Sequence, residues 1–200
     1  MDIYTKRKSI RKYKSAEDGG EVTKEQLTQI LEAARCAPSA KNRQPWRFVV
    51  YTGQAKAELL DCMEKGIAKQ KKSLFMPKKF KNGMASAENT LRIMREAPVI
   101  VMVLNTHSNN PLKPVFAGKR ISEIHDTLSI GAAIENMLLK ATEIGVGSLW
   151  IGNTVYAHDE MSAYMKIDCQ IAGAVAFGIA DEVPEGRPRK ELEEMVEYRS

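Results

Sequence analysis

Cationic residues beside a hydroxyl or a proline gather near both ends of this 200-residue chain. Arg7–Arg11 (RKSIR) carries three cations and a serine, and Arg187–Arg189 (RPR) holds two guanidiniums around a proline. Guanidinium and hydroxyl donors at such spacing suit a discrete anion. Taken alone, however, the first run fits a solvated charged face better than a site. The lysine run from Lys69 to Lys81 fits a solvated face best of all.

Two further segments have residue types that could hold a ligand. The segment Ala37–Trp46 (APSAKNRQPW) is fixed by two prolines and can direct the polar groups of Ser39, Asn42 and Gln44, although it also fits an ordinary helix–strand connection. The segment Gly145–Asn153 (GVGSLWIGN) has closely spaced glycines, which permit close approach of backbone to a ligand. It is not the GxGxxG fingerprint and lacks the βαβ context of that motif.

Side chains that could themselves be reactive are scattered. The cysteines Cys36, Cys62 and Cys169 form no CxxC pair and are interpreted as small buried residues in a reducing compartment. The histidines are equally dispersed, and no spacing fits a metal site or a nucleophilic triad. An enzyme built from this chain would therefore take its reactive group from outside it.

Composition bounds the class of protein. The chain is 44% hydrophobic, an ordinary value that permits a real core, and residues 1–200 are predicted to form a single domain. No apolar run is long enough to span a bilayer, and the N-terminus lacks a signal-peptide pattern, so a cytoplasmic protein with no membrane partner is expected. The net charge of +5 comes without interleaved aromatics, which argues against a nucleic-acid partner.

Hydrophobic periodicity places these segments on helices and strands. Helices are predicted at Val22–Cys36, Lys56–Gln70, Ala85–Arg95, Ser122–Ile144 and His158–Met165, and strands at Arg47–Tyr51, Val99–Leu104, Ser148–Ile151 and Ile171–Ile179. Thr23 and Gln26 resemble a capping box at the first helix. The continuously apolar Val99–Leu104 predicts a strand covered on both faces.

The connecting segments complete this prediction. A lysine-rich segment after Gln70 is expected to be exposed and mobile, and Asn105–Gly118 is expected to be a long loop. After Pro184 the tail is polar and then apolar at Leu192, Met195, Val196 and Tyr198, which need a surface to cover. A layered α/β/α core whose tail packs on a partner chain is therefore predicted.

In their order and spacing, these segments resemble the FMN-dependent nitroreductase family along essentially the whole chain. Arg7–Arg11 is similar to the family's Arg-Arg-Ser-x-Arg motif, and Ala37–Trp46 to its Ala-Pro-Ser-x-x-Asn-x-Gln-Pro-Trp motif. Ser129–Met137 resembles its central helix, Gly145–Gly152 the segment beside the flavin, and Arg187–Arg189 its C-terminal basic pair. The resemblance implies an α+β fold, with three α/β/α layers around a central, mainly antiparallel sheet.

The resemblance also implies a homodimer with an FMN site at each subunit interface. The phosphate would be held by Arg7, Ser9, Arg187 and Arg189. Arg11 would lie near the N1–O2 edge of the isoalloxazine, with the backbone of Lys8 along the ring system. Lys8 stands where the family more often has a second arginine.

The remaining implied contacts come from the two middle segments. Asn42 suits the O2/N3 edge of the ring, while Pro38, Ser39 and Ala40 would reach the flavin from the opposite subunit, and Gln44 completes the set on this loop. Beside the ring would run Trp150, Ile151, Gly152 and Asn153, with a backbone N–H near Gly152 directed at N5. Ala40 and the pair Gly152-Asn153 depart from the commoner family residues.

The activity implied is ping-pong transfer of hydride from NADH or NADPH to flavin N5 and then to a nitroaromatic, a quinone or a similar electron-poor acceptor, with no catalytic side chain. Gly66–Met84 and Asn105–Gly118 would shape the acceptor pocket. Open alternatives are a flavin-fragmenting or dehalogenating member of the family and a flavin-binding sensor or storage protein. The sequence leaves open the physiological acceptor, the choice between NADH and NADPH, and the reduction potential.

Overall fold

The described residues, 2–73, 81–111 and 113–199 of a computed structural model, build one four-stranded antiparallel sheet. Its strand order is β1 (Trp46–Tyr51), β2 (Val99–Asn105), β4 (Gln170–Gly178) and β3 (Gly147–Ile151). In the centre Val101 of β2 lies opposite Val50 and Val175 of its two neighbours. The predicted strands are confirmed, with ends that shift by a single residue.

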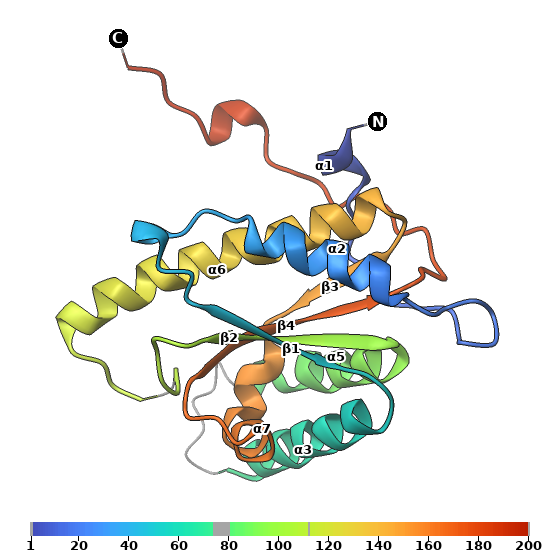
Figure 1. Cartoon of the computed structure of the whole chain (residues 1–200). Coiled ribbons are helices and arrows are strands. Elements are labelled where there is room, and N and C mark those ends of the chain that lie inside the picture. The colour runs from blue at the N-terminus through green and yellow to red at the C-terminus, as the bar shows by residue number, and fades with distance from the viewer. Residues whose placement is uncertain (1, 74–80, 112, 200) are drawn as a thin grey trace.

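Helices cover both faces of this sheet (Figure 1). On one face lie α2 (Lys24–Arg35) and the long α6 (Ala117–Glu143), and on the other α3 (Gly53–Lys72), α5 (Met84–Glu96) and α7 (His158–Met165). Each layer has its own hydrophobic cluster against the sheet. The predicted α+β fold with three α/β/α layers and an antiparallel sheet is confirmed.

Strand β2 shows why its sequence is continuously apolar. Val101 and Val103 pack in the cluster with α2 and α6, whereas Ile100 and Met102 pack in the cluster with α3, α5 and α7. Every residue of β2 is buried. Two helical layers, one on each side, remove the alternation that a half-exposed antiparallel strand would show.

Local signals fix the start of α2 and the end of α6. Thr23 caps α2 by accepting a hydrogen bond from Gln26 N (3.2 Å), and the Gln26 side chain accepts one from Thr23 N (3.0 Å), so the predicted capping box is confirmed. After α6, Gly145 adopts a φ of +76°, a left-handed value that glycine accepts without strain. The predicted end of this helix at Gly145 is therefore correct.

The start of α6 was predicted wrongly. The helix begins at Ala117, before the expected Ser122, and the loop after β2 therefore ends at Phe116 instead of Gly118. The loop was predicted from two prolines and two adjacent asparagines, with Gly118 as its last residue. In the first turn of a long helix, however, a glycine costs only about 1 kcal/mol, and the helix extends cooperatively back from its buried apolar turns, which begin at Ile130.

Several other segments differ from their predictions. Lys71 and Lys72 belong to α3, and since residues 74–80 lie outside the described part, the mobility expected there stays a prediction. Cys36 is exposed and not buried, whereas Cys169 is buried as expected. Short turns of helix that were not predicted occur at α1 (Ile3–Lys6), η1 (Ala40–Asn42), η2 (Asn153–Ala157) and η3 (Leu192–Glu194).

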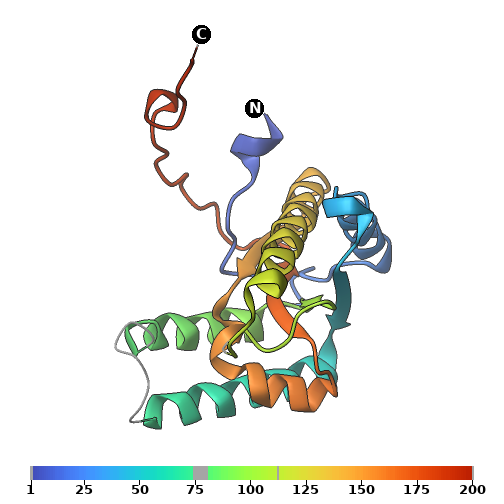
Figure 2. The same cartoon turned by 90° about the vertical axis from the view of Figure 1, so that its left-hand side faces the viewer.

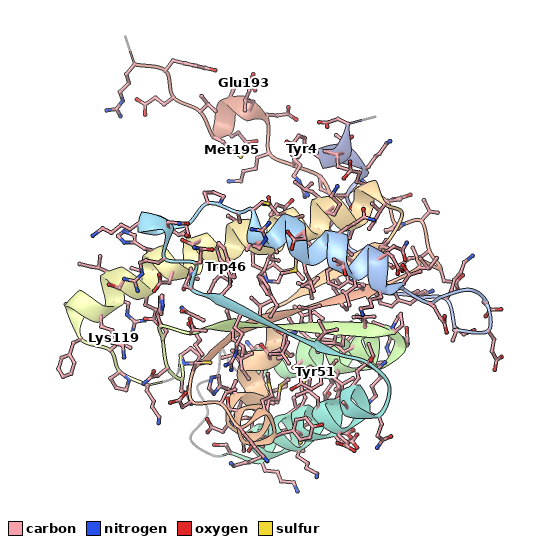
Figure 3. The ribbon with its side chains drawn as sticks, in the orientation of Figure 1. Tyr4, Trp46, Tyr51, Lys119, Glu193 and Met195 are labelled. Atoms are coloured by element: carbon pink, nitrogen blue, oxygen red, sulfur yellow. The ribbon has the colours of Figure 1, made fainter. Side chains whose placement is uncertain are left out.

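The two ends of the chain leave the sheet together. Figure 2 shows the segment after β4 and the N-terminal segment projecting on the same side of the molecule, and Figure 3 places Tyr4 and Met195 beyond α6. The tail residues Leu192, Met195 and Tyr198 are exposed in the single chain, so their packing on a partner stays a prediction. Within the described ranges, no helix has the length and apolar character needed to cross a membrane.

Candidate functional site

The basic segments from the two chain ends line one pocket of about 560 Å³. Of the residues predicted to bind a cofactor, its wall contains Arg7, Lys8, Ser9, Arg11, Arg187 and Arg189. Tyr4, Thr5, Pro184 and Glu185 also line it and were not predicted, although each lies within five residues of a predicted motif. Segments more than 170 residues apart in the sequence therefore share one cationic site.

Backbone pairing brings these ends together. Ile10 N donates to Ser148 O of β3 (2.9 Å), which fixes the N-terminal segment along that edge strand. Further on, Lys14 N donates to Ile179 O and Asp181 N donates to Lys12 O, each at 3.0 Å. The segment that follows β4 is thereby paired with the segment that follows Arg11.

A carboxylate next to the pocket reinforces this pairing. Glu182 Oε1 accepts hydrogen bonds from the backbone N–H groups of Arg11 (2.5 Å) and Lys12 (3.2 Å). The buried Tyr13 donates its hydroxyl to Ile10 O at 2.9 Å. Burial, with a smaller contribution from Glu182, raises the pKa of Tyr13 far above its ordinary value, so this hydroxyl remains a donor.

Charge in the pocket is predominantly positive. Arg7 lies 3.8 Å from a carboxylate oxygen of Glu135 on α6, and the Arg11 guanidinium donates to Ser9 O at 3.1 Å. Gly186 lies directly against Lys8, since a Cβ there would stand 2.7 Å from the lysine Nζ. Convergent guanidinium, ammonium and hydroxyl groups form a donor set that suits a phosphate dianion.

The proline loop lies elsewhere in the same chain. Residues 38–44 are all described and none lines this pocket. They follow α2, at the end of that helix remote from its capping box (Figure 1). Within the loop, Ser39 Oγ accepts from Gln44 N (3.0 Å) and Ser39 O accepts from Asn42 N (2.9 Å).

Residues 150–153 do not line the pocket either. Trp150 is 46% exposed on β3, beside Gly131 of α6. The Ile151 side chain is buried in the core, so only its backbone is available to a ligand. Asn153 Nδ2 donates to Ser86 Oγ (3.1 Å) and Thr90 Oγ1 (2.8 Å) on α5. Within one chain, therefore, neither the proline loop nor residues 150–153 line the pocket that the two chain ends form.

His158 is the most buried of the three histidines described. Its Nε2 accepts from Ile171 N (3.4 Å), while Ser162 Oγ and an Asp159 oxygen both approach Nδ1, at 3.4 and 3.6 Å. Burial lowers the pKa of His158. A relay needs its two partners on opposite ring nitrogens, so this group lacks the geometry of a nucleophilic triad. No group of three His, Cys, Asp or Glu side chains that could hold a metal ion occurs among the described residues.

Residues 4–179 match the model of the Nitroreductase family. The chain belongs to this family. The identification made from the ordered motifs is therefore confirmed. The match includes all four strands of the sheet and the N-terminal residues that line the pocket.

Individual relatives resemble the chain over nearly its whole length. A Bacillus subtilis (strain 168) protein provisionally named NAD(P)H nitroreductase YfhC is 27% identical over 191 residues, which cover 94% of this chain and 88% of the relative. A BluB-like flavoprotein from Clostridium difficile 630 is 26% identical with a TM-score of 0.73, covering 100% and 98%. The FMN-dependent nitroreductase NfnB from Mycobacterium smegmatis, solved in complex with NADPH, shares the fold at 18% identity, with a TM-score of 0.73 and coverage of 99% and 96%.

Proposed function

We propose that this protein is a homodimeric, FMN-dependent oxidoreductase that passes hydride from NADH or NADPH to nitroaromatic, quinone or similar electron-poor acceptors. The observation that carries the proposal is the pocket in which the two ends of the chain bring five cationic side chains and Ser9 together. Relatives named as NAD(P)H nitroreductases and an FMN-dependent one solved with NADPH support the choice of cofactor and donor.

The pocket residues fit the phosphate of FMN. Arg7, Arg187 and Arg189 supply guanidinium donors and Ser9 a hydroxyl, a set that binds a phosphate dianion through charge-assisted hydrogen bonds. Arg11, held by Glu182, would direct its charge toward the N1–O2 edge of the ring. A fixed cation there favours negative charge on that edge during reduction.

When bound, FMN supplies the redox chemistry, accepting hydride at N5 and delivering it to the second substrate. The chain's own residues would orient the ring and exclude water. The partner's Asn42, on the proline loop, would pair with the O2/N3 edge, and the backbone at Gly152 would present an N–H toward N5. In this scheme Trp150, half exposed on the edge strand, shields the ring edge from solvent.

Two features support a dimer with composite sites. Along α6, Ile121, Ile124 and Leu128 expose apolar side chains at i, i+3 and i+7, a stripe that soluble proteins cover with a partner. The proline loop, remote from the pocket of its own chain, would reach the flavin of the second subunit through Pro38, Ser39 and Ala40. The apolar tail from Leu192 would cover the same partner.

The test begins with the purified protein. Its visible spectrum should show bound oxidised flavin, and its mass in solution should be that of a dimer. Addition of NADH or NADPH without oxygen should bleach the flavin absorbance. A nitroaromatic or quinone added next should restore the oxidised spectrum. A colourless monomer that FMN does not reconstitute contradicts the proposal.

The same experiment separates the alternatives. A sensor or storage protein would show the flavin spectrum but no bleaching by either nicotinamide. A flavin-fragmenting member would lose the spectrum irreversibly when air is admitted to the reduced protein. Full recovery of oxidised FMN, verified by chromatography after acid extraction, supports the oxidoreductase.

A further inference from the structure

A buried charged junction joins α6 to two loops at the end of the sheet where β1 begins and β2 ends (Figure 1). Its centre is Asp126 of α6, whose side chain is 1% exposed. One carboxylate oxygen accepts from the Arg43 guanidinium at 3.0 Å and lies 3.5 Å from His107 Nδ1. The same Arg43 nitrogen lies 3.1 Å from the His107 ring. Arg43 belongs to the proline loop and His107 to the loop after β2.

The proline loop needs an external hold. Lys41, Asn42 and Gln44 have φ values of 54°, 53° and 47°. These values lie in the left-handed region, which residues other than glycine adopt only at a cost in conformational free energy. Three such residues within four positions would relax unless the surroundings fixed them. Besides Arg43, the loop is held by Ala40 N, which donates to Ser129 Oγ (3.2 Å) one turn after Asp126.

The loop after β2 is tied to the same place. Pro45 O accepts from both Thr106 N (2.8 Å) and Thr106 Oγ1 (3.0 Å), which extends the pairing of Trp46 with Asn105. His107 N in turn donates to Asn105 Oδ1 at 3.1 Å. The two loops therefore lie side by side, with Asp126 behind both.

The stability of the fold alone does not explain an aspartate at position 126. Its other oxygen, Oδ1, is buried and has no hydrogen-bond partner among the described residues. A buried carboxylate satisfied on one side costs free energy that an apolar residue at this place would not. Buried groups of this kind concentrate where a particular geometry has to be kept.

We infer that Asp126 is a positioning residue that sets the flavin-contacting loop 37–46 and the loop 105–111 together against α6. The inference rests on the proposed function, in which the first loop contacts the partner's flavin and the second borders the acceptor. Movement of one loop is then transmitted to the other through Arg43 and His107. Neither Asp126 nor His107 lines the phosphate pocket. The junction would therefore affect the binding of the flavin ring and of the acceptor, and not the binding of the phosphate.

Hydrogen exchange of the full-length protein stripped of flavin tests the junction directly. Asp126→Asn should speed exchange about tenfold in peptides covering 37–46 and in those covering 105–111, with other peptides unchanged. Glu123→Gln is the matched control, because Glu123 is also buried on α6 but pairs with Arg120 of the same helix. It should leave both loops as in the wild type.

Ser129→Ala provides a second variant with a different expected pattern. It removes the acceptor of Ala40 N, together with a hydrogen bond from Ser129 Oγ to His125 O inside α6, and leaves Arg43 and His107 on Asp126, so exchange should rise in 37–46 and not in 105–111. The junction is overturned if Asp126→Asn leaves either loop unchanged, or if Ser129→Ala loosens both loops equally.

A flavin titration then links the junction to function. Asp126→Asn should raise the dissociation constant of FMN about tenfold and raise KM for the acceptor, whereas Glu123→Gln should change neither. An unchanged FMN affinity, with both loops loosened, contradicts the positioning role. Hydrogen exchange is measured without flavin, so its result on the junction stays valid even if the protein proves not to be a flavin-dependent oxidoreductase.

Discussion

Replacing Glu182 by alanine should weaken FMN binding although this side chain need not contact the cofactor. Glu182 accepts the backbone N–H groups of Arg11 and Lys12, which hold the N-terminal wall of the pocket against the segment leading to Arg187. Without the carboxylate, the two walls can separate. The convergence of cations on the phosphate is then no longer fixed before binding.

The size of the effect follows from the contacts removed. Hydrogen bonds to a charged acceptor contribute about 1.5–3 kcal/mol each when buried, and partial exposure of Glu182 reduces this to about 1 kcal/mol. Two such bonds give about 2 kcal/mol, or about 30-fold in affinity if the whole loss falls on the bound state. The backbone bonds of Lys14 and Asp181 remain, so about a tenfold rise in the dissociation constant is expected.

The assay is titration of apoprotein with FMN, followed by quenching of flavin fluorescence. Glu182→Gln is the matched control, because an amide oxygen can accept the same two N–H groups, and its dissociation constant should stay within about threefold of the wild type. Far-ultraviolet circular dichroism checks that each variant is folded. Wild-type affinity in Glu182→Ala would refute the reasoning.

Three other variants test separate parts of the structure. Glu185→Gln removes the carboxylate that lines the cationic pocket and should tighten FMN binding a fewfold in the same titration; weaker binding contradicts the assigned anion site. Leu128→Asp should convert the proposed dimer to a monomer that loses FMN, measured by analytical ultracentrifugation, whereas Val50→Asp, at an exposed position on β1, should behave as the wild type. Burial lowers the pKa of His158 in the folded protein below its ordinary value of 6.5. The stability that the neutral ring contributes is therefore complete above pH 6.5 and is lost as the pH falls through the lowered pKa of the folded state. Urea midpoints should therefore gain nothing from His158 between about pH 8 and about pH 6.5, decline below about pH 6.5, and decline less there in His158→Gln; equal slopes below that pH would exclude His158 as the cause.

The layers of the fold could be predicted because their signals are local. The apolar run of β2 and the capping box of α2 depend on neighbouring residues alone. The start of α6 could not be predicted, because Gly118 resembles a loop residue and the turns before Ile130, the first buried apolar residue of the helix, have no buried apolar face. The α1 and η1 turns are too short to show periodicity.

The candidate site shows the same division. Both ends of the chain carried visible anion-binding patterns, and pairing through Ile179 and Asp181 brings them into one pocket. Glu182 gave no signal, because its role is to accept backbone N–H groups from a segment 170 residues away. The junction at Asp126 was hidden for a similar reason, since Arg43 and His107 meet only after β1 and β2 pair.

Comparing FMN with riboflavin tests the central claim most directly, because the two differ only in the phosphate. Titration of apoprotein should show FMN binding at least about 100-fold more tightly, as expected from several charge-assisted hydrogen bonds of about 1.5–3 kcal/mol each. In the double variant Arg187→Ala/Arg189→Ala, FMN affinity should fall close to that of riboflavin. Equal affinities for the two flavins in the wild type, or FMN binding that is unchanged in the double variant, would contradict the assignment of this pocket.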